Sequence, residues 1–193
     1  MPIGNTPVDF RVTDHELARR FETAMSPHLD AAYNLARWLA RDPHNAEDVV
    51  QEAYLRAFRF FGGFRGGDGR AWLLAIVRNT FYSWLEQNKR HEAQVEYNDE
   101  TVGLQMTEAS GDEALHGTDP EKLLLRAADQ GLVERGLLKL APEYREILVL
   151  RELEELSYKE IAEIVGVPLG TVMSRLSRAR AQLRIQIEAL ERT

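Results

Sequence analysis

The sequence lacks cysteine, long apolar runs and a targeting signal, and each absence removes a class of protein. Without any Cys in 193 residues there is no disulfide framework, no thiolate nucleophile and no Cys-based zinc site. The N-terminal segment MPIGNTPVDF has neither a basic start nor an apolar core, so we expect no signal peptide. No apolar run reaches the roughly 18–20 residues of a membrane span. We therefore expect a cytoplasmic protein that does not insert into a membrane.

Signatures of catalysis and of metal binding are missing as well. The histidines show no metal-ligand spacing with one another, so we expect no metal site and no cofactor. The glycine-rich segment 62–69, GGFRGGDG, lacks the Lys-Ser/Thr pair of a phosphate-binding loop. No segment alternates like a β-strand, and we find no internal repeat. The sequence therefore predicts an all-α protein without catalytic residues, and an enzyme is the least favoured class.

The net charge of −7 is confined to one segment. Residues 1–92 hold 12 basic and 12 acidic side chains, and residues 133–193 hold 10 of each. Residues 93–132 hold 2 basic and 9 acidic side chains, which accounts for the whole excess. Residues 93–118 also lose all apolar periodicity, which is typical of a flexible linker. We predict a helical domain over 14–92, a flexible acidic linker over 93–119 and a second small helical domain over 120–193.

The second domain carries a helix-turn-helix pattern. Ser157 and Glu160 have capping-box spacing for a short helix, and Gly166 is suited to the left-handed position that ends it. The helix expected from about residue 169 has a narrow apolar stripe and, over residues 165–184, four arginines and no acid. Arginine-rich helix faces are often only solvated. Here the coincidence of turn, cap and missing acids favours DNA binding.

Two further polar patterns occur in the first domain. On the helix expected over about 45–60, Asp48, Gln51, Glu52 and Arg56 share the face opposite the apolar side. By itself such a stripe is usually a solvated surface. The helix over 70–90, with a bend expected near Asn79, interleaves aromatic and basic residues. That mixture suits stacking on unpaired bases, but in an isolated helix the aromatics would more often be core.

In this order, the segments resemble one protein family. AEDVVQEAYLRAF, GRAWLLAIVRNTFYSWLEQNKR and LAPEYREILVLRELEELSYKEIAEIVGVPLGTVMSRLSRARAQLR look like regions 2.2, 2.3–2.4 and 4 of the extracytoplasmic-function (group 4) sigma factors. These are small members of the sigma-70 family of bacterial RNA polymerase. The resemblance covers about residues 18–92 and 121–190. It implies two helical domains, sigma2 and sigma4, which bind core RNA polymerase and promoter DNA and are held inactive by an anti-sigma factor.

The resemblance also implies roles for individual residues. Core polymerase would bind Asp48, Gln51, Glu52 and Arg56. In the family, a loop between two helices of sigma2 captures a base flipped from the −10 element, and the matching residues here are Asn79 and Thr80. Trp72 would pack the core or stabilise the melted fork. The remaining −10 contacts would come from Arg70, Arg78, Lys89 and Arg90. The −35 duplex would be read through Tyr158, Lys159, Thr171, Ser174, Arg175, Ser177, Arg178 and Arg180.

One departure and one alternative accompany this prediction. Many relatives have a basic residue after the GTV segment, where this chain has Met173, so one DNA contact there is in doubt. In the family the two promoter elements lie about two helical turns apart, on the order of 70 Å at ~34–36 Å per turn. The alternative is a stand-alone helix-turn-helix regulator that needs no polymerase. No dimerisation heptad and no small-molecule fold support that alternative.

Overall fold

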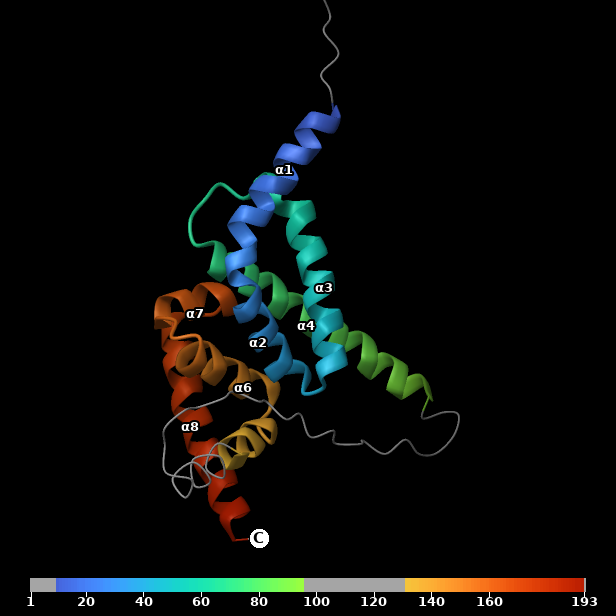
Figure 1. Ribbon diagram of the computed structural model, residues 1–193. Helices are drawn as coiled ribbons and strands as arrows, with labels where there is room; N and C mark the ends of the chain where they lie inside the picture. The colour runs from blue at the N-terminus through green and yellow to red at the C-terminus, as the bar shows by residue number, and fades with distance from the viewer. Residues whose placement is uncertain (1–9, 96–130, 193) are drawn as a thin grey trace, which may run out of the picture.

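The computed structural model describes residues 10–95 and 131–192, with side chains over 15–88 and 131–192, and every element within these ranges is a helix. The described chain forms two lobes that lie against each other (Figure 1). No helix in the described ranges combines the length and apolarity that a bilayer crossing requires. The all-α prediction is confirmed for these residues.

The first lobe is built from four α-helices and two short 3-10 turns. They are α1 (Phe10–Met25), η1 (Ser26–His28), α2 (Leu29–Ala40), α3 (Pro43–Phe60), η2 (Phe61–Gly63) and α4 (Gly69–Val95). The carboxylate of Asp42 accepts a 2.9 Å hydrogen bond from the backbone N–H of Asn45 and so caps α3. The Asp68 carboxylate does the same for α4, where it accepts from the N–H groups of Arg70 and Ala71.

The core of the first lobe follows the predicted helical spacing. On α3 the small residues Val49, Ala53 and Ala57 are fully buried, which lets α2 and α4 approach that side closely. The glycine-rich segment between η2 and α4 needs its glycines only at Gly66 and Gly67, where φ is 87° and 103°. This segment returns the chain from the end of α3 to the start of α4.

The second lobe begins with the helical residues 131–138 and continues through α6 (Pro142–Leu148), the π-helical turn η3 (Val149–Leu153), α7 (Tyr158–Val165) and α8 (Leu169–Glu191). Leu140, Ile147, Leu150, Ile161 and Leu176 are buried at its centre. The turn η3 extends α6 as one helical run over 142–153. In this wider turn the Glu154 N–H donates to the Val149 carbonyl, five residues earlier, at 3.0 Å.

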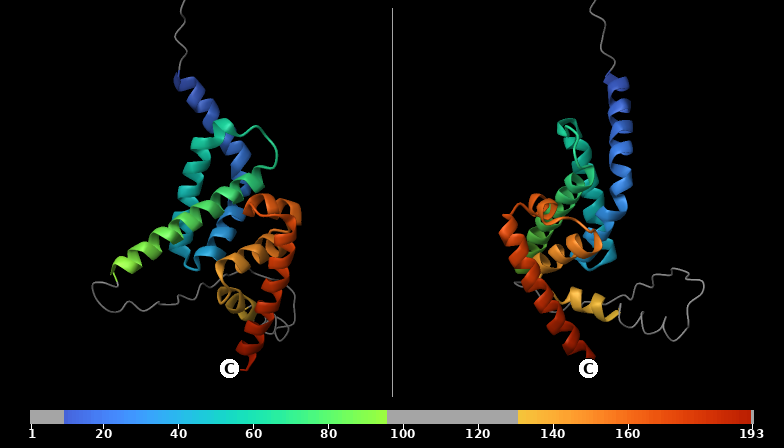
Figure 2. Two further views of the ribbon diagram at one scale, coloured as in Figure 1. Left: turned by 180° about the vertical axis from the view of Figure 1, so that it is seen from behind. Right: turned by 90° about the vertical axis from the view of Figure 1, so that its left-hand side faces the viewer.

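The lobes meet along two pairs of helices. α7 lies beside the first turns of α4, and α6 lies beside α2 (Figures 1 and 2). α4 ends at Val95, a little beyond the predicted domain boundary at 92. The rest of the predicted linker, 96–119, and the start of the second domain, 120–130, lie outside the described residues. Sequence periodicity predicts the helices of each lobe but not this contact between them.

Candidate nucleic-acid interface

The helix-turn-helix unit forms as its sequence predicts. The Ser157 hydroxyl accepts from the Glu160 N–H at 3.3 Å, and the Glu160 carboxylate accepts from the Ser157 N–H at 2.7 Å, which completes the capping box. These hydrogen bonds lower the pKa of the Glu160 carboxyl. Gly166 ends α7 in the left-handed conformation with φ 71°. Buried Val172, Leu176 and Ala179 then fix α8 against α7 and α6.

The outer side of α8 offers short hydroxyls and guanidinium groups to solvent. Ser174, Ser177 and Arg178 are exposed, whereas Thr171 and Arg175 are half-buried. Arg180 is exposed but pairs with Glu152 of η3 at 2.7 Å, and this hydrogen bond raises its pKa. Small hydroxyl residues allow a helix to enter a major groove, where arginines reach phosphates or guanine edges. The helix therefore has the form of a DNA-reading helix with one arginine already engaged.

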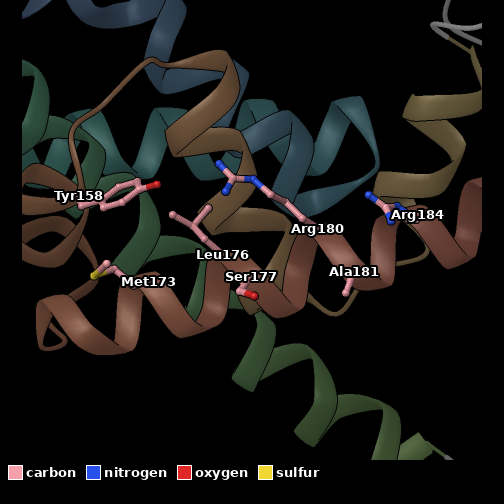
Figure 3. A pocket seen from close by; sticks show the side chains of 7 residues that line it. All are labelled: Tyr158, Met173, Leu176, Ser177, Arg180, Ala181 and Arg184. Atoms are coloured by element: carbon pink, nitrogen blue, oxygen red, sulfur yellow. The ribbon is translucent and has the colours of Figure 1, made fainter.

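A shallow groove of about 360 Å³ lies between α7 and α8. Figure 3 shows Tyr158 of α7 facing the side of α8 that carries Met173 and Leu176. The ring of Tyr158 also lies 5.1 Å from the Arg151 guanidinium, and Lys159 is exposed beside it. The groove is lined by Tyr158, Met173, Leu176, Ser177, Arg180, Ala181 and Arg184. Met173 is exposed, so the position of the sequence departure is open to solvent and presents a thioether rather than a charge.

Some of the aromatic and basic residues of α4 lie in the core of the first lobe, and others lie where the two lobes meet. Trp72 packs against Phe61 and Phe64, with ring centroids 6.4 and 5.0 Å away, so it belongs to an aromatic cluster of the first lobe. Phe81 is buried. Of the two roles open to Trp72 in the sequence, the structure supports packing. The side chains of Lys89 and Arg90 lie outside the described residues.

The loop expected at Asn79 and Thr80 is absent, which corrects the sequence-based placement. α4 is one continuous helix from Gly69 to Val95, and both residues lie within it. Asn79 is exposed and accepts a 3.2 Å hydrogen bond from Arg78. Thr80 is only 3% exposed, and its hydroxyl oxygen has no partner among the described residues. In this conformation the pair does not form an open base-capturing pocket.

A buried polar cluster joins α4 to the second lobe. The Arg78 Nε lies 2.7 Å from Glu146 Oε1, a close charge contact whose N–H is not aligned on the oxygen. The Tyr82 hydroxyl donates to Glu146 Oε2 at 3.2 Å, and the Arg78 guanidinium lies 4.7 Å from the Tyr82 ring centre. Nearer the start of α4, Arg70 is hydrogen-bonded to Glu154. Two predicted DNA contacts of the first lobe are thus engaged by acids of the second.

The environment of this cluster shifts the pKa values of two neighbouring residues of α6. Burial raises the pKa of Glu146 to about 7, although Arg78, the Tyr82 hydrogen bond and Arg175 of α8 all act to lower it. Burial lowers the pKa of Arg145 to about 10, and nearby Arg41 of α2 lowers it further. The Nε and Nη1 of Arg145 have no hydrogen-bond partner among the described residues. The lobe contact therefore includes incompletely satisfied charges.

The polar stripe of α3 faces solvent on the side away from the core. Asp48 and Gln51 are exposed, and Glu52 accepts a 2.7 Å hydrogen bond from Arg56 one turn later. Leu55, which is 48% exposed, adds an apolar side chain to this surface. The structure confirms that the four polar residues share one accessible face, while their role as a polymerase contact stays a prediction.

Comparison with known proteins identifies the family. The family models "Sigma-70 region 2" and "Sigma-70, region 4" match residues 25–91 and 130–183. The chain is 34% identical over 157 residues to RNA polymerase sigma factor YlaC of Bacillus subtilis, covering 78% of this chain and 83% of the relative. It is 35% identical over 147 residues to the ECF RNA polymerase sigma-E factor of Escherichia coli, covering 75% of each. The chain belongs to the extracytoplasmic-function sigma factors of the sigma-70 family.

A solved relative extends this membership to the fold. The sigma factor RpoE of Bartonella quintana, solved with the anti-sigma factor NepR, superposes with a TM-score of 0.68 at 28% identity and covers 88% of this chain and 98% of that one. The first lobe of this sigma factor therefore corresponds to region 2, and the second lobe to region 4. Both matched regions, residues 25–91 and 130–183, fall within the helical domains predicted over 14–92 and 120–193.

The sequence prediction for this sigma factor missed the acids that cover α4. Glu146 and Glu154 belong to helix α6 and its π-helical extension, outside the segment with the DNA-reading pattern. The sequence does contain a signal that Glu146 is buried, because Arg145 and Glu146 directly precede the apolar run of residues 147–150. Six consecutive residues of a helix point in all directions, so the burial of residues 145–150 requires that more than one side of this helix is covered by other parts of the protein.

Among the described residues, no group of three His, Asp or Glu side chains has the arrangement of a metal site. This finding concerns residues 10–95 and 131–192 alone. The chemistry that the described surfaces do offer is recognition of nucleic acid and of protein by charged and hydroxyl side chains.

Proposed function

We propose that this sigma factor binds core RNA polymerase through the α3 face, reads the −10 element through α4 and reads the −35 element through α8. It acts in the cytoplasm by binding rather than by catalysis. The observation that carries the proposal is the presence, in one chain, of a hydroxyl- and arginine-bearing recognition helix and a separate helix of basic and aromatic residues. Two DNA-reading elements on separate lobes suit a promoter with two separated sites.

Each element suits a different form of DNA. The recognition helix α8 exposes Ser174, Ser177 and Arg178, which fit the edges and phosphates of an intact duplex. On α4, Arg70 and Arg78 would hold the backbone of a strand whose bases have been unpaired, and Asn79 carries an amide suited to a base edge. Family membership favours this function over the stand-alone regulator, which would have no use for the second element.

We also infer control by an anti-sigma factor. The relative from Bartonella quintana was solved with such a partner, and this chain matches nearly all of that sigma factor. The exposed polar face of α3 and the groove beside α8 are both accessible to such a partner. With no Cys, the chain itself cannot respond to oxidants through a thiol.

Run-off transcription tests the proposed function. Purified core polymerase, the full chain and the DNA upstream of its own gene are combined, and the transcripts are separated by size. We expect a discrete transcript that falls at least about fivefold with Arg178→Ala, because losing a specific base contact costs about 1–3 kcal/mol of discrimination. Arg192→Ala is the matched control, since Arg192 is exposed at the far end of the same helix and should leave the transcript unchanged.

The failure outcomes are distinct. If no transcript forms and the chain does not co-elute with core polymerase, the sigma function is wrong and the stand-alone regulator replaces it. If both variants reduce the transcript equally, α8 contributes charge rather than specific contacts. Asn79→Ala, compared with the exposed Gln87→Ala on the same helix, applies the same logic to the −10 element.

A further inference from the structure

The recognition helix α8 has two flanks of different chemistry. One flank carries Arg178, whose side chain is exposed. The other flank faces Tyr158 of α7 and carries Met173, which is 53% exposed (Figure 3). Arg180 lies on this second flank, but its Nε and Nη2 both donate to one carboxylate oxygen of Glu152, at 3.2 and 2.7 Å. The second flank therefore offers an apolar side chain and an arginine whose donors are partly occupied.

Met173 belongs to a small apolar surface. The groove between α7 and α8 joins the Met173 thioether to the ring of Tyr158 and to Leu176, which is only 1% exposed. The exposed hydroxyl of Ser177, one helical turn after Met173, borders the same groove. A flexible thioether adapts its shape to an apolar partner and is only a weak hydrogen-bond acceptor. This surface is suited to a small apolar group that enters beside a hydroxyl.

The position of Met173 on α8 places this surface at the base edges of a bound duplex. In a helix-turn-helix unit, the N-terminal residues of the recognition helix contact base edges, while the preceding helix crosses the DNA backbone. Met173 lies in the second turn of α8, which begins at Leu169. Lys159, at the start of α7, is exposed and can hold a phosphate there. Met173 thus lies between a backbone contact and the hydroxyl of Ser177.

Only one group on the major-groove edges of the bases is apolar. Thymine presents a 5-methyl group there, whereas the other groups that distinguish the base pairs are hydrogen-bond donors and acceptors. A donor or acceptor pressed against Met173 would lose its water without gaining a strong partner, which costs free energy. A thymine methyl group loses only unfavourable contact with water. The chemistry of this flank therefore discriminates in favour of thymine.

Resting on the proposed function, we propose that Met173 is a specificity-determining residue of this sigma factor, which reads the 5-methyl group of a thymine in the −35 duplex. Tyr158 and Leu176 supply the rest of the apolar surface that the methyl group contacts. Ser177 and Arg178 remain available to neighbouring base edges and phosphates. The −35 element then contains one thymine that is recognised by its methyl group.

Replacement of thymine by deoxyuridine tests this contact, because it removes the methyl group and leaves base pairing unchanged. The full chain, bound to core RNA polymerase, first selects sites from a pool of randomised DNA duplexes. Each thymine of the selected −35 segment is then replaced singly, on either strand, and the affinity is measured at one fixed salt concentration. We expect one replacement to weaken binding about fourfold, the factor that corresponds to one buried methyl group.

Three variants of the chain assign that effect to a side chain. Met173→Ala should abolish the difference between thymine and deoxyuridine at this position, whereas Met173→Leu should keep it, because leucine restores an apolar surface. Ile185→Ala is the matched control, since Ile185 is an apolar residue of the same helix that is 60% exposed and lies outside the groove. This control should keep the full effect. Circular dichroism checks that each variant retains its helices.

The proposal is overturned if no thymine responds to the replacement, or if the response persists in Met173→Ala. It is also overturned if Ile185→Ala abolishes the response, because the effect would then report a weakened lobe rather than a contact. In each of these cases the selected duplexes still bind, so the proposed function stands. If selection enriches no duplex, the proposed function itself fails, and the contact with thymine fails with it.

Discussion

The recognition helix depends on Leu176, whose replacement should weaken the second lobe by a predictable amount. Leu176 is 1% exposed and lies between α7 and α6 on the inner side of α8. Replacing a fully buried leucine by alanine removes apolar contact and leaves a cavity, which costs about 3 kcal/mol in a site of this kind. Ile185 is a matched control on the same helix, since it is 60% exposed and should lose less than about 0.5 kcal/mol.

Urea unfolding followed by circular dichroism measures this difference. With a slope of about 2 kcal/mol per molar urea, a loss of about 3 kcal/mol lowers the midpoint by about 1.5 M. Leu176→Ala should also lose −35 binding in proportion to the unfolded fraction, although the residue itself touches no DNA. Equal midpoints for Leu176→Ala and Ile185→Ala would refute the packing of α8 described above.

Three further predictions concern the cap, the turn and the buried acid. Ser157→Ala removes one half of the capping box and should cost about 1 kcal/mol in the same unfolding assay, whereas Ser26→Ala, an exposed serine with no side-chain cap, should be neutral. Gly166→Ala should cost about 1–2 kcal/mol from its positive φ alone, because an added Cβ meets nothing within 4 Å; a larger loss would mean an unseen clash. The raised pKa of Glu146 means that the lobes in contact hold a proton that separated lobes would release, so the contact between the lobes should weaken as pH rises from about 5 through 7. The distance between spin labels on Arg59→Cys of α3 and Glu163→Cys of α7, two exposed positions in a chain without other thiols, should change between pH 5.5 and 8, and this change should be lost in Glu146→Gln. An unchanged dependence would assign it to another group.

Local signals in the sequence predicted local structure well. The Ser157–Glu160 box and Gly166 correctly predict the two ends of α7, because both signals depend only on backbone groups within a few residues. The apolar side expected for the helix over about 45–60 is the buried side of α3, where Val49 and Ala53 lie. These features need no information from distant parts of the chain, so periodicity and cap chemistry were sufficient to predict them.

Contacts between distant segments could not be predicted in this way. The Tyr82–Glu146 hydrogen bond joins residues 64 positions apart, and the Arg70–Glu154 pair joins residues 84 apart. A separation of this size along the chain leaves no periodic pattern of residues from which the contact could be predicted. The expected loop at Asn79 was wrong for a different reason: it came from the family resemblance, whereas the helix-forming residues around it continue α4 through that position.

If this sigma factor engages both promoter elements, its two lobes must separate when it binds core polymerase, and a single experiment tests polymerase binding and lobe separation together. The spin-labelled full chain is mixed with core RNA polymerase, the complex is isolated by size exclusion, and the distance between the lobes is measured in the bound and free protein. We expect co-elution and a single distance that is longer in the complex than in the free protein. Failure to co-elute, or co-elution with the short distance unchanged, would contradict it.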